Sequence, residues 1–150
     1  MSRVVSLTHE FVEYIPDRLV DGVLYISIPY ATAVHRCCCG CGNKVVTPIS
    51  PTDWTLIFDG RTVSLDPSIG NWNFKCRSHY WIQHNKIMWA RQWTNDMVNA
   101  GRARDRHRKD EYIHRANQPR DERSEEPRQK ESRWGRLFRG RNPLGPPKDE

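Results

Sequence analysis

Four of the five cysteines in this chain lie within five consecutive positions, and this cluster limits what the chain can fold into more than any other feature: Cys37, Cys38, Cys39 and Cys41. The fifth, Cys76, is followed three positions later by His79. A secreted disulfide framework spaces its cysteines more widely and uses an even number of them. The cluster therefore predicts a metal site in a reducing compartment. Zinc fits best, because it takes four thiolate or imidazole ligands in a tetrahedron.

The spacing leaves more than one ligand set open. Cys38 and Cys41 have the two-residue gap of an ordinary zinc pair, and Cys76 with His79 would form the second pair. An alternate spacing instead puts three thiols on one side of an extended segment: Cys37, Cys39 and Cys41. Unmetallated buried thiols, a redox pair or an iron–sulfur cluster rank below zinc. Four protein ligands would make the zinc structural, and an open position would make it catalytic.

Charge and hydropathy divide the chain in two. Residues 1–92 hold nine Lys and Arg against seven Asp and Glu, whereas residues 101–150 hold 15 against ten and have few large apolar side chains. We expect a zinc-binding β domain over 1–92 and a charged, helical or disordered tail over 93–150. No apolar run approaches the length of a transmembrane helix, and the N-terminus has no apolar signal region. We therefore expect a cytoplasmic protein with no membrane partner.

Short runs rich in β-branched and aromatic residues predict the fold of the first part. They occupy residues 11–15, 23–28, 44–49, 54–58, 62–65, 80–83 and 86–89. Asp59-Gly60 and His84-Asn85 separate the last four runs into two hairpins. The sequence therefore predicts a mainly β fold: a small, zinc-stabilised antiparallel β domain.

The pattern becomes helical near residue 92. Trp93, Met97 and Ala100 recur on one helical face, and Gly101 could end that helix. Further on, a small docking helix could form around three apolar residues flanked by arginines: Trp134, Leu137 and Phe138. The basic tail could also bind nucleic acid, although its ten acidic residues weaken that interpretation.

Several motifs in a fixed order give the chain a family resemblance. They are residues 31–42 with the cysteines, 47–51 followed by Trp54, 66–72, and 76–82. Together they resemble a bacterial domain family of unknown function over about residues 20–90. Some members of that family are encoded beside ubiquitin-like proteins and their activating and conjugating enzymes. The resemblance implies a serine-peptidase-like protein that trims or removes a ubiquitin-like protein.

The resemblance also narrows the ligand set. Related sequences often read Cys-Pro-Cys-Gly-Cys-Gly here, which implies four metal ligands: Cys37, Cys39, Cys41 and Cys76. Cys38 then stands where relatives carry proline and is a spare thiol. His79 would be free to act as a general base.

A serine peptidase needs a base within hydrogen-bond reach of its nucleophile. Ser78 and His79 are adjacent, so on a strand their side chains point to opposite faces. Ser68 lies in a segment that we expect to be a loop, residues 67–71, whose glycine leaves backbone N–H groups approachable. We therefore prefer Ser68 with His79 over the other hydroxyl candidates, Ser64 and Ser78. His35 is the other candidate base, and three acids could orient a base: Asp53, Asp59 and Asp66. Each of these residues could instead have a non-catalytic role. Ser68 could stabilise a turn, His79 could be a zinc ligand, and His35 could donate a hydrogen bond beside the metal.

Five aromatic residues could line a groove for an extended peptide or could form the core: Trp54, Trp72, Tyr80, Trp81 and Trp89. Three functions thus remain in competition. The first is a zinc-stabilised peptidase that matures or removes a ubiquitin-like protein. The second is a non-enzymatic zinc module that binds a protein or nucleic acid, and the third is a metalloenzyme with a zinc-bound water.

Overall fold

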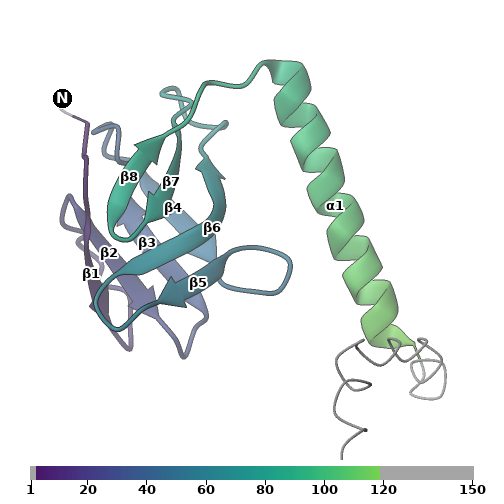
Figure 1. Ribbon diagram of the computed structural model, residues 1–150, viewed down its shortest axis with the longest axis horizontal. Coiled ribbons are helices and arrows are strands. Elements are labelled where there is room, and N and C mark those ends of the chain that lie inside the picture. The colour runs from purple at the N-terminus through teal and green to yellow at the C-terminus, as the bar shows by residue number, and fades with distance from the viewer. Residues whose placement is uncertain (1–2, 119–150) are drawn as a thin grey trace, which may run out of the picture. The chain divides into compact units, whose positions relative to one another are not determined.

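The computed structural model of the protein describes residues 3–118, and eight strands and one helix follow one another along this part of the chain (Figure 1). The strands are β1 Thr8–Phe11, β2 Val23–Ser27, β3 Thr32–Arg36, β4 Lys44–Pro48, β5 Thr55–Phe58, β6 Val63–Gly70, β7 His79–Gln83 and β8 Lys86–Trp89. The helix is α1, Asn95–Asn117. The prediction of a mainly β fold followed by a helical segment is confirmed.

The strands form two four-stranded sheets, in the orders β1-β2-β3-β4 and β5-β6-β7-β8. All neighbours pair antiparallel except β1 and β2, which are parallel. Ser6 pairs with Lys86 of β8 at one edge, and Ile49 pairs with Trp54 at another. These two bridges join the sheets, so both contribute to one core.

The core is built from residues that alternate along the strands. The burial of β4 alternates strictly, with Val45 and Thr47 buried and their neighbours exposed, as expected for a strand with one face on the core. The largest fully buried apolar side chains come from β2, β6 and β7: Tyr80, Leu24, Ile26, Leu65 and Ile82. Cys37 and Cys38 belong to the same cluster. The thiols therefore lie at the border of the core.

Both predicted hairpins are confirmed. β5 and β6 pair antiparallel around Asp59-Gly60, and β7 and β8 around His84-Asn85. The conformation at Gly60 (φ 92°) is one that glycine adopts most easily. The first strand was predicted too late, at residues 11–15, because exposed charged and polar residues interrupt the apolar pattern of Thr8–Phe11.

The helix also differs from its prediction. It begins at Asn95, after the Thr94 hydroxyl accepts a hydrogen bond from the Met97 amide (3.3 Å). The predicted face was wrong, because Met97 is half exposed and the buried residue is Val98. Gly101 does not end the helix. Its missing side chain instead admits Trp93, since a Cβ there would lie 3.0 Å from the indole.

Within residues 3–118, no helix is long and apolar enough to cross a bilayer. The division of the chain at residue 92 stays a prediction. The suggested docking helix around Trp134, Leu137 and Phe138 lies outside the described residues, as does most of the proposed nucleic-acid-binding tail.

Candidate metal centre and serine–histidine pair

Four thiols gather where the turn after β3 meets the loop between β6 and β7. The sulfur atoms of the cluster all lie within 4.8 Å of one another: Cys37, Cys39, Cys41 and Cys76. The sulfur–sulfur distances include 3.4 Å for Cys37–Cys39, 3.9 Å for Cys37–Cys76 and 3.7 Å for Cys41–Cys76. Thiolates about 2.3 Å from a tetrahedral zinc would lie about 3.8 Å from each other. The donor set and its spacing therefore fit zinc.

The backbone around the thiols turns tightly. Gly40 and Gly42 have φ values of 85° and 77°, which glycine adopts at little cost. The Gly40 amide donates to the Cys37 carbonyl (3.0 Å), and the Cys37 amide donates to the Asn43 carbonyl (2.8 Å). These bonds fold the Cys37–Cys41 run back on itself so that its alternate thiols converge.

The thiols do not share one environment. Cys38 is fully buried and is not part of the four-sulfur group, and burial raises the pKa of its thiol to about 12. At Cys41 burial opposes the thiolate, yet the hydrogen bonds from the Asn43 backbone and from the neighbouring thiols together outweigh burial and lower the pKa to about 7. Thiolates are the metal-binding form of cysteine. The low pKa of Cys41 thus favours metal capture, whereas Cys38 is set apart by its position outside the four-sulfur group.

Polar side chains support the cluster from inside. The Ser78 hydroxyl lies 3.1 Å from the Cys37 sulfur, and the Asn71 amide nitrogen donates to the Ser78 oxygen at 2.9 Å. His35 lies at the edge of this network, because the Tyr80 hydroxyl that it contacts also accepts a hydrogen bond from the Asn71 amide nitrogen (3.4 Å). Its Nε2 lies 2.9 Å from the Tyr80 hydroxyl, and burial lowers its pKa to about 4. His35 is fully buried, so it is poorly placed to act as a base on a substrate.

A second group of residues lies on the other side of β7. Ser68 Oγ is 2.9 Å from His79 Nε2, and His79 Nδ1 is 3.0 Å from the backbone carbonyl oxygen of Arg91. A carbonyl oxygen only accepts, so Nδ1 carries the proton and Nε2 accepts from the Ser68 hydroxyl. This is the tautomer that a histidine needs in order to activate a serine.

Local irregularity in β6 places Ser68. We expected a loop at this position, but Ser68 lies within the strand, where the pairing of β6 with β7 shifts between Leu65 and Ile69. Bulges of this kind redirect a side chain. Gly70 then pairs with His79. Ser68 is thereby the diagonal neighbour of His79 across two strands.

Aromatic rings enclose His79, which is only 4% exposed. The ring centroids of Trp72, Trp93 and Trp81 lie 5.0, 5.1 and 5.6 Å from that of His79. Trp72 also stacks on Trp93, at 5.6 Å and 18°. Gly70 makes this possible, because a Cβ at that position would overlap the Trp72 indole. The rings limit how far the imidazole can rotate.

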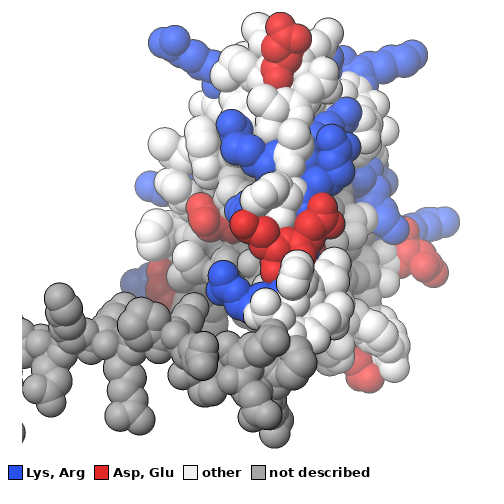
Figure 2. All heavy atoms as spheres, turned by 90° about the vertical axis from the view of Figure 1, so that its right-hand side faces the viewer, with Lys and Arg blue, Asp and Glu red and all other residues white. Residues whose placement is uncertain are grey.

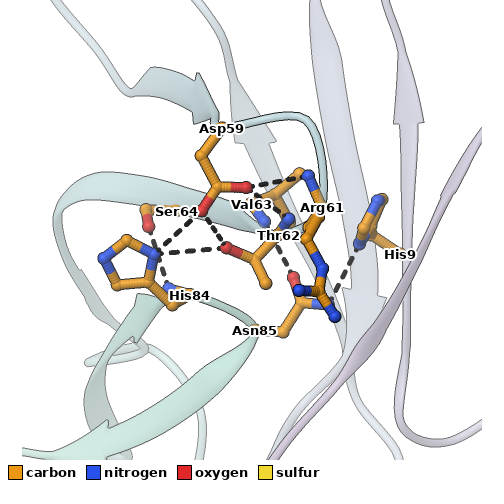
Figure 3. Close-up of polar contacts among 8 residues, drawn as sticks. All are labelled: His9, Asp59, Arg61, Thr62, Val63, Ser64, His84 and Asn85. Carbon is orange, nitrogen blue, oxygen red and sulfur yellow. Dashed lines mark hydrogen bonds and ion pairs between the residues drawn. The ribbon is translucent and has the colours of Figure 1, made fainter.

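The other predicted site residues lie elsewhere. Figure 3 shows Asp59 at the β5–β6 turn, where its carboxylate accepts from the amides of Arg61 and Thr62 and lies 3.3 Å from His84 Nδ1. The Ser64 hydroxyl accepts from the His84 amide (2.9 Å). Asp53 accepts from Ser50 and from Lys109. Among the described residues, no hydrogen bond or ion pair joins Asp66 to His79, whose ring nitrogens contact Ser68 and Arg91.

A cavity of about 850 Å³ opens beside the pair, and Ser68, His79, Trp54 and Trp72 all line it. Tyr80, by contrast, is fully buried, and Trp89 packs against the core. Of the five aromatic residues, Trp54 and Trp72 thus line the groove, Tyr80 and Trp89 belong to the core, and Trp81 packs beside His79. The opposite wall comes from α1, including Arg102 and its neighbours.

Sequence reasoning missed the partners of His79 that follow β8. No residue pattern identifies the carbonyl oxygen of Arg91 as an acceptor, because every residue carries one. Trp93 was assigned to a helical face, whereas it precedes the helix and packs on His79. The only sequence signal for this packing was the position of Trp93, four residues after the end of β8.

Comparison with known proteins adds one result. A family model described as "Bacterial ubiquitination-like system serine protease (BubE)" matches residues 11–90, more than half of the 150 residues. The resemblance seen in the sequence over about residues 20–90 is confirmed. No curated protein and no solved structure gives a significant match.

Proposed function

Because the chain belongs to the family of bacterial ubiquitination-like system serine proteases (BubE), we propose that it is a serine-type peptidase that matures or removes a bacterial ubiquitin-like protein. Ser68 is the nucleophile and His79 the general base. The observation that carries the proposal is the 2.9 Å contact between Ser68 Oγ and His79 Nε2, on the wall of a cavity. We place the reaction in the bacterial cytoplasm.

The chemistry follows from the tautomer of His79. Nε2 takes the proton of the Ser68 hydroxyl as Oγ attacks the scissile carbonyl carbon. The imidazolium then returns that proton to the departing amine, and an ester on Ser68 remains. Water, deprotonated by Nε2, hydrolyses the ester and releases the free carboxylate. The Arg91 carbonyl keeps the Nδ1 proton in place and stabilises the imidazolium, the role that a carboxylate has in a triad.

Zinc has a structural role in this proposal. Four thiolates would complete its coordination and leave no position for a reactive water: Cys37, Cys39, Cys41 and Cys76. Bound zinc would hold the turn after β3 against the loop before β7. Ser78 contacts Cys37, and the next residue is His79. The metal would therefore fix the start of the strand that carries the base.

A fluorophosphonate probe tests the nucleophile directly, since it labels activated serines. Wild-type protein should be labelled on Ser68 and should hydrolyse a Gly-Gly coumarin amide. The Ser68→Ala and His79→Ala variants should each lose about 10³-fold or more in turnover while keeping the metal. Ser64→Ala is the matched control, because that hydroxyl contacts only a turn amide, and it should behave as wild type. A fully active Ser68→Ala protein would contradict the proposal and favour a non-enzymatic zinc module.

A further inference from the structure

The cavity beside Ser68 has a basic wall that the peptidase chemistry does not use. Its volume, about 850 Å³, falls within the range of about 300–1,000 Å³ that is usual for ligand sites. The β domain contributes Ser68, His79 and Trp72, and α1 contributes most of the charged lining. A substrate that reaches Ser68 must pass this wall.

The wall is one face of α1. Residues that line the cavity recur at three- and four-residue steps along the helix: Val98, Gly101, Arg102, Asp105, Arg108 and Lys109. Arg104 and His107 also line it, outside that row of residues, whereas Arg106 does not. Figure 2 shows Lys and Arg together with Asp and Glu along the outer face of α1, as is usual for a solvated helix surface.

The charges on the wall are only half compensated. Lys109 contacts Asp53 at 2.6 Å, and Arg108 contacts Asp105 at 2.6 Å. Arg102 donates to the neutral side-chain oxygen of Asn73 (2.7 Å), which leaves its charge unbalanced. The Arg104 side chain has no hydrogen-bond or ion-pair partner among residues 3–118. Two guanidinium groups are thus available beside the serine–histidine pair.

We propose that this wall binds carboxylates of the polypeptide substrate, so that the enzyme selects acidic side chains close to the scissile bond. The proposal rests on the proposed peptidase function and names its substrate class. Arginine pairs with carboxylate through two parallel hydrogen bonds, which gives affinity and fixes the orientation of the bound segment. The pairing is stronger in a partly enclosed cavity than at an open surface.

An acidic polypeptide suits this wall better than nucleic acid does. Nucleic acid needs a continuous basic stripe that follows its phosphates. Here Asp105 lies on the same wall, Asp53 pairs with Lys109 of that wall from the β domain, and acidic groups are mixed with basic ones on the outer face of α1. Two isolated arginines match separate side-chain carboxylates, and the indole of Trp72 offers an apolar surface for the remaining backbone.

The test measures binding rather than turnover, on the full chain carrying Ser68→Ala so that the probe stays intact. The probes are fluorescein-labelled peptides with Gly-Gly flanked on one side by three Glu, and their Gln counterparts. The three Glu stand before Gly-Gly in one peptide and after it in the other. By fluorescence anisotropy, one of these two Glu peptides should bind about tenfold tighter than its Gln counterpart, and high salt should remove the difference. Arg104→Glu should abolish the preference.

Arg106→Glu is the matched control, since it makes the same charge change two positions away and outside the cavity. It should retain the preference. Equal binding of Glu and Gln peptides, or equal losses in the two variants, would overturn the proposal. So would tighter binding of a labelled single-stranded oligonucleotide than of the Glu peptide. If the Glu preference holds but wild-type protein is not labelled by fluorophosphonate, the peptidase function fails and the carboxylate-binding wall stands.

Discussion

The thiol cluster and the serine–histidine pair lie on either side of the start of β7, yet they are assembled in opposite ways. Three of the four thiols come from the short run Cys37–Cys41. The pair draws on Ser68 in a strand irregularity, on His79 in the next strand, and on a carbonyl beyond β8. A site built from local sequence can be recognised from spacing, whereas a site built from strand register cannot.

Two adjacent residues connect these regions. Ser78 contacts the sulfur of Cys37, and His79 contacts Ser68. Extended backbone sends successive side chains to opposite faces, so one residue step separates the metal region from the proposed base. Substitutions in the thiol cluster should therefore impair both folding and activity, whereas substitutions in the serine–histidine pair should impair activity alone.

Loss of a metal ligand should produce the largest effect. Cys76→Ser removes the thiol that joins the β6–β7 loop to the Cys37–Cys41 turn. Structural zinc contributes on the order of 10 kcal/mol to folding in small domains, so we expect loss of the metal and of the cooperative melting transition. Metal analysis and circular dichroism measure both.

Cys38→Ala is the control for that substitution, because Cys38 is buried outside the four-sulfur group. It should keep the metal and lose only about 1 kcal/mol of stability through the small cavity it leaves. A Cys38→Ala protein without metal, or a Cys76→Ser protein with it, would show that the ligand set is different.

A substitution at Gly70 should affect the pair and spare the metal. In Gly70→Ala the new methyl group would overlap the Trp72 indole, which packs on His79 and Trp93. Displacing the rings should lower kcat about 10- to 100-fold, because a small misplacement of a base is costly. Steady-state kinetics measures this effect. Unchanged kcat would show that the aromatic rings do not position His79, and retained metal would separate the two regions.

The smallest effect should come from Asp59, which belongs to neither region. Hydrogen bonds from Thr62 and Arg61 hold the pKa of this carboxyl well below its usual range. Because the folded-state pKa is the lower one, the ionised form stabilises the fold above about pH 4, and this contribution is lost as the pH falls further. Asp59→Asn should lower Tm by a few degrees at neutral pH.

The Asp59 prediction is checked by thermal melting across pH. The Tm difference between wild type and Asp59→Asn should stay constant from neutral pH down to about pH 5 and shrink below about pH 4. A difference that grows toward low pH would contradict the assigned direction. Activity should stay close to that of wild type.

The sequence alone predicted much of this molecule. The hairpins were found because Asp59-Gly60 and His84-Asn85 sit between apolar runs. The family resemblance supplied the choice among thiol ligands, which spacing had left open. The strand Thr32–Arg36 was not predicted, because the run of buried residues from Ala33 to His35 hides the alternation that identifies a strand.

The site was less accessible to sequence reasoning. Pairing Ser68 with His79 needed the family resemblance, since nothing in the residue pattern gives the register of β6 against β7. The three candidate acids were a natural choice for orienting a base, yet a backbone oxygen occupies that place. The face of α1 was misjudged because Trp93 and Met97 are more apolar than the glycine and arginines that line the cavity.

The acceptor at Arg91 has a consequence for genetics. A carbonyl oxygen belongs to the main chain, so all side-chain substitutions at this position retain it. An alanine scan will therefore miss the group that holds His79 in the tautomer that the proposed mechanism needs, and codon changes at this position cannot delete it. Only synthesis can weaken it, by an ester in place of the amide between Arg91 and Gln92. It also lies one residue beyond the family-matched segment, so a fragment cut to that boundary would lose it.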